Sequence, residues 1–409
     1  MISRNQALAL DAIDPLKDFR QQFILPEKII YLDGNSLGAL PKRTPIYLQE
    51  IIQKQWGEDL IKSWNLHNWI HWPQTVGTKI ARLIGAKPHE VIVADSTSVN
   101  LFKLLAGALK LRPDRRTILS EKSNFPTDLY MAQGLLALLE KDYQLKIVER
   151  EMLIESIDHS VALVMVTEVN YLTGHRHNLK TLAEAAHGQG ALILVDLAHS
   201  AGAMPVDLNQ NSIDLAVGCG YKYLNGGPGA PAYLYISEAL QADFPAFLAG
   251  WLGHADPFAF TENYVPAFGM NRHLCGTPPI LSLAALDCGL NICLEADLQA
   301  IRQKSLALGD LFIDQVEAHC PELVLATPRD PERRGSQVSF HHSHGYAVMQ
   351  ALIAQGVIGD FRSPDIIRFG FAPLYNRYVD IWDAADQLCE ILKNRTWSEP
   401  QFQQRQTVT

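Results

Sequence analysis

The sequence lacks the motifs by which several protein classes are recognised. It has no C-x-x-C pair and no G-x-x-x-x-G-K-[ST] phosphate loop, and Gly218 and Gly220 have no third glycine to complete a dinucleotide fingerprint. No apolar run reaches the length of a membrane span, and the N-terminal segment has no signal-peptide core. These absences argue against P-loop, nicotinamide-binding and membrane proteins.

Basic residues are also scarce, with 35 Lys and Arg against 44 Asp and Glu and a formal charge of −9. This balance argues against a nucleic-acid or anionic-membrane partner. The six cysteines are scattered: Cys219, Cys275, Cys288, Cys293, Cys320 and Cys389. Their spacing predicts reduced thiols, and neither a disulfide framework nor a zinc site. We therefore expect a soluble, cytoplasmic protein.

Short β-rich runs alternate with helical patterns through the middle of the chain. The expected strands lie near 91–94, 117–119, 145–148, 163–166, 192–195, 214–217 and 232–236. Continuous apolar strands that alternate with helices predict a mostly parallel sheet covered on both faces. Three shorter strands, near 323–325, 337–340 and 366–369, follow a long helical segment. We expect an N-terminal arm over 1–45, a large domain over 46–285 and a small domain over 286–409.

Two residues in the large domain point to pyridoxal phosphate (PLP) chemistry. Lys222 lies in the small-residue segment G-Y-K-Y-L-N-G-G-P-G, and Asp196 ends the apolar run L-I-L-V-D. A lysine can form a Schiff base with PLP, and a carboxylate keeps the pyridine nitrogen protonated so that the ring accepts electrons. Most lysines are solvated surface residues, so the rest of the site has to support this interpretation.

Three further segments are compatible with a cofactor pocket. D-S-T-S-V-N, residues 95–100, follows a strand and opens an apolar helix, whose free N–H groups can hold a phosphate. Phe125 and Asp128 follow another strand, where an aromatic ring can stack on a pyridine. His199 lies three residues after Asp196. Each has a plainer structural explanation, namely helix capping, a turn and a buried structural histidine.

The segments together resemble the kynureninase family, in the class V aminotransferase branch of PLP fold-type I enzymes. The similarity rests on D-x-x-H at 196–199, G-Y-K-Y-L-N-G-G-P-G at 220–229, G-N-S-L-G at 34–38 and A-P-L-Y-N at 372–376. It implies the PLP-dependent transferase fold, with a seven-stranded, mostly parallel sheet in the large domain and a smaller α+β C-terminal domain. The lysine segment and G-N-S-L-G are the specific motifs, whereas D-x-x-H occurs in many PLP enzymes.

The resemblance assigns cofactor contacts residue by residue. Lys222 would form the Schiff base and move the substrate α-proton, Asp196 would pair with the pyridinium, and Phe125 would stack on the ring. Tyr221 would hold the phosphate or its vicinity, and it is the candidate for proton transfer at Cβ or at the hydrated γ-carbonyl. The remaining cofactor residues would be Thr97, Ser98, Asp128, Thr167, His199, Trp251 and Thr277. In the family the last two act across a dimer interface, which implies a homodimer with shared active sites.

The resemblance also implies the substrate. Arg368 would bind the α-carboxylate of L-kynurenine, since a guanidinium fork matches a carboxylate. Asn35, Ser36, Trp64 and Gly276 would complete the substrate site. The expected reaction is hydrolysis of the Cβ–Cγ bond to anthranilate and L-alanine, a step of tryptophan catabolism. Trp64 with Gly276 and Thr277 predicts that 3-hydroxykynurenine is the poorer substrate.

Two other functions compete with this hypothesis. A cysteine desulfurase needs a mobile catalytic cysteine, but Cys320 precedes a proline and Cys389 lies in an apolar-periodic helix. A catalytically silent PLP-binding module would have lost Lys222 or Arg368, and both are present. A strand would point His341 to the face opposite His342 and His344, and no cysteine or carboxylate partner lies nearby in the sequence, so we expect no metal site.

Overall fold

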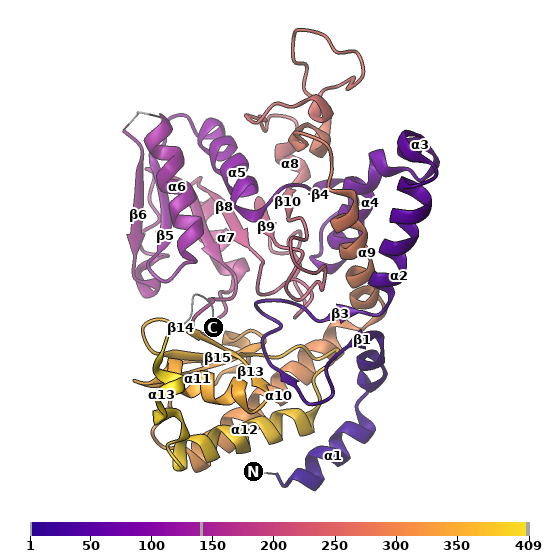
Figure 1. The fold of residues 1–409 in the computed structure, drawn as a ribbon. Helices are drawn as coiled ribbons and strands as arrows, with labels where there is room; N and C mark the ends of the chain where they lie inside the picture. The colour runs from indigo at the N-terminus through magenta and orange to yellow at the C-terminus, as the bar shows by residue number, and fades with distance from the viewer. Residues whose placement is uncertain (1, 140–141, 406–409) are drawn as a thin grey trace.

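The computed structural model describes residues 2–139 and 142–405 (Figure 1). Its largest element is a seven-stranded sheet of order β4-β10-β9-β8-β7-β5-β6. The strands are β4 (Val91–Val93), β5 (Thr117–Glu121), β6 (Gln144–Val148), β7 (Val161–Thr167), β8 (Leu192–Asp196), β9 (Leu215–Gly218) and β10 (Tyr233–Ile236). All neighbours from β9 to β6 pair in parallel, and β10 alone runs antiparallel to both its neighbours. The predicted sheet is confirmed.

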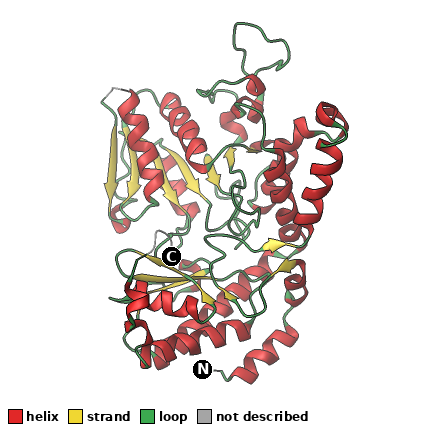
Figure 2. Cartoon of the chain, in the orientation of Figure 1, coloured by secondary structure: helices red, strands yellow, loops and turns green. Residues whose placement is uncertain are grey.

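Both faces of this sheet are apolar because successive residues of a strand point to opposite sides. In β8, Leu192 and Leu194 join the core formed with α5 (Thr97–Leu111) and α6 (Pro126–Leu139). Ile193 and Val195 join the other core, under α4 (Trp72–Leu83), α7 (Leu179–Gly188) and α9 (Ile280–Glu295). Figure 2 shows these helices on either side of the sheet. The alternation explains why the strands read as continuous apolar runs.

A second, antiparallel sheet lies toward the C-terminus, in the order β11-β12-β15-β14. Its strands are β11 (Val324–Leu325), β12 (Gln337–His341), β14 (Asp360–Arg362) and β15 (Ile366–Gly370). It packs with α10 (Leu298–His319), α11 (Gly345–Ala354) and α12 (Tyr378–Lys393), for example through Phe312 against Phe369 at 4.7 Å between ring centroids. The sequence predicted three of these strands and missed β14.

The N-terminal segment lies against the C-terminal unit (Figure 1). Strand β2 (Ile30–Tyr31) pairs in parallel with β13 (Val357–Ile358). In α1 (Arg4–Ile13), the Asp11 carboxylate accepts the N–H groups of Tyr378 and Val379, at 2.7 and 3.0 Å, and so caps α12. The remaining short elements are β1 (Phe23–Ile24), β3 (Leu40–Pro41), α2 (Arg43–Glu50), α3 (Ser63–Leu66), α8 (Glu238–Gln241) and α13 (Pro400–Gln403).

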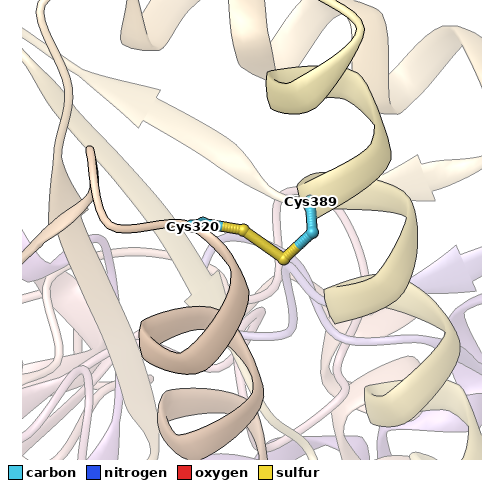
Figure 3. The surroundings of a disulfide bond; sticks show 2 residues. All are labelled: Cys320 and Cys389. Carbon is cyan, nitrogen blue, oxygen red and sulfur yellow. A yellow bond between two sulfur atoms is a disulfide. The ribbon is translucent and has the colours of Figure 1, made fainter.

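One prediction about the cysteines is wrong. Cys320, directly after α10, and Cys389, in α12, form a disulfide with their Cα atoms 5.6 Å apart (Figure 3). The two lie 69 residues apart in the sequence and meet because α10 packs against α12. Spacing along the chain carries no signal of such a contact. The other four cysteines are free.

Two findings concern membranes and metals. Within 2–139 and 142–405, no helix has both the length and the apolar character to cross a bilayer. The same residues contain no cluster of three or more His, Cys, Asp or Glu side chains placed to bind a metal ion. His344 instead stacks on Trp397 with ring centroids 4.3 Å apart.

Candidate active site

A cavity of about 280 Å³ opens where the parallel strands end. Strands β7 and β8 contribute their last residues, Thr167 and Asp196, and the loop after β9 contributes Lys222. The carboxyl ends of adjacent parallel strands meet at one edge, which is where α/β proteins bind ligands. The lining residues are Thr97, Ser98, Phe125, Thr127, Asp128, Thr167, Tyr171, Asp196, Ala198, His199, Cys219, Tyr221 and Lys222.

The cavity therefore brings together the predicted cofactor residues with two exceptions, Trp251 and Thr277. It also adds residues that the sequence did not reveal, above all Tyr171. The Tyr171 ring packs edge-on against Phe125, with centroids 5.1 Å apart. Tyr171 lies in the loop that follows β7, where no motif marks it.

Lys222 is placed by a tightly closed loop. The N–H of Asn225 donates to the Lys222 carbonyl at 2.9 Å, and the N–H of Gly226 donates to the Gly220 carbonyl at 2.9 Å. Asn225 adopts a left-handed conformation, with φ of 55°, which asparagine tolerates better than most residues. The Lys222 Nζ lies 5.9 Å from the ring centroids of both Phe125 and Tyr221. The amine is thus directed into the cavity, beside two aromatic rings.

The G-N-S-L-G segment packs directly on that loop. The Gly38 N–H donates to the Tyr221 carbonyl at 2.8 Å. A Cβ at Gly38 would collide with the Lys222 carbonyl oxygen, so only glycine allows this approach. The segment and the lysine loop, 184 residues apart (222 − 38), form one structural unit. Their sequence motifs belong to a single site.

Two buried carboxylates face the same cavity. Burial raises the pKa of Asp196, although the charge of Lys222 opposes the rise. Burial, and then the charge of Asp196, hold the pKa of Asp128 well above its usual value. Asp196 accepts the Ala198 N–H at 2.7 Å, but Asp128 Oδ1 has no hydrogen-bond partner within the described residues. A buried acceptor without a donor is costly, so the pocket calls for a ligand that supplies donors or positive charge.

PLP fits this arrangement. Its protonated ring nitrogen and its ring hydroxyl would supply what Asp196 and Asp128 lack. The N-terminus of α5 begins at the cavity wall, where the Ser96 hydroxyl accepts the Val99 N–H at 3.3 Å. The nearby N–H groups and the hydroxyls of Thr97 and Ser98 can receive a phosphate.

His199 is neutral in this pocket. Burial, and then the charge of Lys222, hold its pKa well below the usual value. Its Nδ1 lies 3.0 Å from the Gln337 amide oxygen, and the Gln337 amide donates to the Tyr171 carbonyl at 3.1 Å. Gln337 was not predicted. It connects the cofactor cavity to the four-stranded sheet through β12.

Arg368 lies in β15, the strand that pairs with β12. It is 2% exposed, so it is not a surface arginine at a strand end. Its Nη1 donates to the Tyr171 carbonyl at 2.6 Å and its Nη2 to the Ser36 hydroxyl at 3.0 Å. Once the Asn35 amide is turned to satisfy both neighbours, its oxygen accepts from Arg368 Nε at 3.0 Å. The predicted residues Arg368, Asn35 and Ser36 therefore lie together, next to Tyr171.

The remaining predicted residues, two for the substrate (Trp64 and Gly276) and two for the cofactor (Trp251 and Thr277), do not line this cavity within one chain. Trp64 lies in α3 and packs on Trp69 with centroids 6.0 Å apart. Trp251 begins the short helix Trp251–Gly253 and contacts Phe258 at 5.7 Å between centroids. Gly276 and Thr277 are exposed.

Comparisons with known proteins identify the relatives of this chain. The kynureninase of Pseudomonas fluorescens is 51% identical over 416 aligned residues, covering 100% of both chains. Kynureninases of Burkholderia mallei SAVP1 and Burkholderia pseudomallei 1106a match at the same identity and coverage. The profile of the kynureninase C-terminal domain matches residues 301–388.

Solved structures show the same fold at low identity. An apo cysteine desulfurase from Thermococcus onnurineus NA1 superposes with a TM-score of 0.78 at 21% identity, covering 92% of this chain and 98% of that one. The cysteine desulfurase CsdA from Escherichia coli gives a TM-score of 0.76 at 19% identity, covering 96% and 99%. Identities this low support the fold assignment alone.

Proposed function

Because the chain belongs to the kynureninase family, we propose that it hydrolyses L-kynurenine to anthranilate and L-alanine with PLP as cofactor. The observation that carries this function is the 51% identity to kynureninases along the entire chain. The cavity supports it, since a lysine, two buried carboxylates and a helix N-terminus surround one space of suitable chemistry. Bound PLP supplies an electron sink for the negative charge that develops at the substrate α-carbon.

Lys222 is the proton carrier at the α-carbon in this proposal. Its amine lies 5.9 Å from the ring centroids of both Phe125 and Tyr221. Tyr221 is the candidate for proton transfer at Cβ or at the hydrated γ-carbonyl. Burial raises the pKa of Tyr221, so its hydroxyl keeps its proton at neutral pH and can donate it.

The remaining pocket residues hold the cofactor. Asp196 would pair with the ring nitrogen, Phe125 would cover one ring face, and the α5 start with Thr97 and Ser98 would bind the phosphate. Asp128, Thr167 and His199 complete the polar wall. The Thr167 hydroxyl supports this placement, since it donates to Asn124 Oδ1 at 2.5 Å and lies 3.4 Å from Asp128 Oδ2.

Arg368 binds the α-carboxylate of the substrate, with Asn35 and Ser36 beside it. Its contact with the Tyr171 carbonyl supports the assignment, because the Tyr171 side chain lines the cofactor cavity. A substrate joined to the cofactor would thus have its carboxylate within reach of a buried guanidinium.

Trp251 and Thr277 of the partner subunit complete the phosphate site of a homodimer in this proposal. Both residues lie outside the cavity of their own chain, and Thr277 is exposed. We further propose a cytoplasmic location and the division into residues 1–45, 46–285 and 286–409.

Anthranilate fluorescence tests the reaction. Purified protein supplied with PLP and L-kynurenine should release anthranilate and equimolar L-alanine. The desulfurase alternative predicts sulfide release from L-cysteine instead. Both C-terminal cysteines are bonded to each other, which leaves neither as a free nucleophile. Sulfide release without anthranilate would refute the proposed function.

Substrate preference is a finer prediction. In this proposal Trp64, Gly276 and Thr277 border the substrate ring only in the assembled dimer, since they lie outside the cavity of a single chain. They offer little to a 3-hydroxyl, and leaving that group without a partner costs about 1–3 kcal/mol. We therefore expect kcat/KM for L-kynurenine to exceed that for 3-hydroxykynurenine by roughly ten- to a hundredfold. Equal values would refute the assignment of these three residues and leave the reaction itself untouched.

A further inference from the structure

Arg368 is gripped by a carboxylate from the neighbouring strand. Asp360 in β14 lies directly opposite Arg368 in β15. Asp360 Oδ1 accepts from Arg368 Nε at 2.8 Å, and Asp360 Oδ2 accepts from Arg368 Nη2. Both residues are 2% exposed. This two-point contact uses one edge of the guanidinium, and such paired contacts fix its plane as well as its position.

Asp360 is itself fully held. Besides the two bonds from Arg368, it accepts the Ser36 hydroxyl at 2.9 Å and contacts Arg362 Nη2 at 2.7 Å. A carboxylate offers about four acceptor positions, and the four contacts of Asp360 therefore leave its side chain little freedom to reorient. Burial alone would raise the pKa of Asp360, but the charges and hydrogen bonds of Arg368 and Arg362 outweigh it and hold the pKa below the usual value. Asp360 is therefore an ionised, immobile anchor.

The rest of the guanidinium meets neutral groups. Arginine has five N–H donors, of which Asp360 takes two (the one on Nε shared with the Asn35 oxygen), the Tyr171 carbonyl one and the Ser36 hydroxyl one. No described residue accepts the fifth, which is on Nη1. A carboxylate is a stronger acceptor than a carbonyl or a hydroxyl, so an incoming carboxylate can take up the N–H of Nη2 now held by Ser36.

We propose that Asp360 is the positioning residue of the substrate carboxylate site, fixing Arg368 by one edge so that Nη1 and Nη2 are presented to the substrate. The proposal rests on the proposed role of Arg368. The alternative is that Asp360 competes with the substrate for the guanidinium. The two predict opposite signs, because removal of a competitor tightens carboxylate binding and removal of an anchor weakens it.

The test uses 4-(2-aminophenyl)-4-oxobutanoate, the substrate skeleton without its α-amino group. It cannot bond to the cofactor, so its Kd for the holoenzyme, measured by calorimetry, reports the carboxylate and ring sites. In Asp360→Asn we expect Kd to rise about ten- to a hundredfold, the worth of an oriented charge-assisted contact. KM for L-kynurenine should rise with it, while kcat at saturation changes much less. Asp365→Asn is the matched control, since Asp365 lies near β15 but contacts His341.

The following outcomes would overturn the proposal. A lower Kd in Asp360→Asn would favour the competitor, and an unchanged Kd would mean that Asp360 has no role in carboxylate binding. A fall in kcat with Kd unchanged would place the role of Asp360 elsewhere. If Arg368→Gln also left Kd unchanged, the assignment of Arg368 would fail and the positioning role with it. If Arg368→Gln alone weakened binding, the proposed function would stand and this inference would be wrong.

A double variant separates positioning from general stability. Because Asp360 is proposed to act through Arg368, adding Asp360→Asn to Arg368→Gln should change Kd little further. Additive losses would contradict the proposal. Should Asp360→Asn fail to fold, Asp360→Glu keeps the charge but moves the carboxylate by one methylene. It should still weaken the probe several-fold, and an unchanged Kd in that variant would equally refute the positioning role.

Discussion

The cofactor cavity and the Arg368 cluster lie side by side, but they differ in how far hydrogen-bond donors and opposite charges compensate their buried carboxylates. In the cavity, Asp128 and Asp196 are buried with few donors, and Asp128 Oδ1 has none within the described chain. In the cluster, Asp360 meets two guanidinium groups and a hydroxyl. The first region lacks donors that a ligand could supply, whereas the charges of the second are compensated by the chain itself, which leaves one N–H of Arg368 without an acceptor among the described residues. Segment 33–38 joins them, since Ser36 contacts Arg368 and Gly38 contacts the lysine loop.

The largest expected effect comes from the cavity. Lys222→Ala should lower kcat by at least about 10²–10⁴-fold, the contribution of a positioned proton-transfer group. The absorbance of lysine-bound cofactor should disappear as well. Lys122→Ala is the control, because Lys122 is solvent-exposed and pairs with Glu149. Anthranilate release at the parental rate by Lys222→Ala would remove the lysine from the mechanism.

Stability measurements test the contrast directly. Asp360→Asn breaks a buried ion pair and should destabilise the apoprotein by about 3–5 kcal/mol. Asp128→Asn replaces a carboxylate whose pKa is already held high, so the apoprotein should be as stable as the parent or more stable. Urea unfolding of both apoproteins gives the comparison. Equal losses in the two variants would mean that the regions do not differ in charge compensation.

Hybrid dimers test which region needs a second chain. Mixing Lys222→Ala with Trp251→Ala protein should restore activity above the sum of the two, since one site of the hybrid would have both residues intact. Mixing Lys222→Ala with Arg368→Gln should restore none, because those two residues serve the same site from one chain. Recovery in neither mixture would argue that Trp251 acts within its own chain.

The smallest effect is a pH dependence of carboxylate binding. Burial, and then the charge of Asp360, raise the pKa of Asp33 to about 7. Below that pH Asp33 is neutral, and Arg362, Arg368 and Asp360 give the cluster a net charge of +1 (2 − 1). Above it Asp33 is ionised and the net charge is zero. The Kd of the probe without the α-amino group, 4-(2-aminophenyl)-4-oxobutanoate, should therefore rise as pH passes through 7, by about tenfold or less.

Other groups around Asp33 leave this sign unchanged. The titratable groups that face it are Asp360, Arg362, Arg368 and the phenols of Tyr31, Tyr223 and Tyr375. Burial raises the pKa of all three phenols, so they stay neutral over this range. Asp33→Asn should flatten the dependence. A Kd profile that keeps its slope in that variant would assign the titration to another group.

The sequence predicted the cavity much better than the cluster around Arg368. Lys222, Asp196 and the α5 start were recognisable because strand ends and helix starts carry local signals. Asp360 gave none, since β14 is three residues long and two of the three are charged. Tyr171 and Gln337 were missed for the same reason: each acts through contacts with residues far along the chain.

What the sequence determined by itself is the alternation of strands and helices, the lysine loop and the family. Those properties depend on residues that are neighbours along the chain, so hydrophobic periodicity and turn residues in the sequence identify them. Tertiary structure decided that Gly38 packs on Lys222, that Cys320 bonds to Cys389 and that Asp360 holds Arg368. Each of these joins residues from different elements. A side chain's partners across such distances are set by how layers and strands pack, and no local pattern encodes that packing.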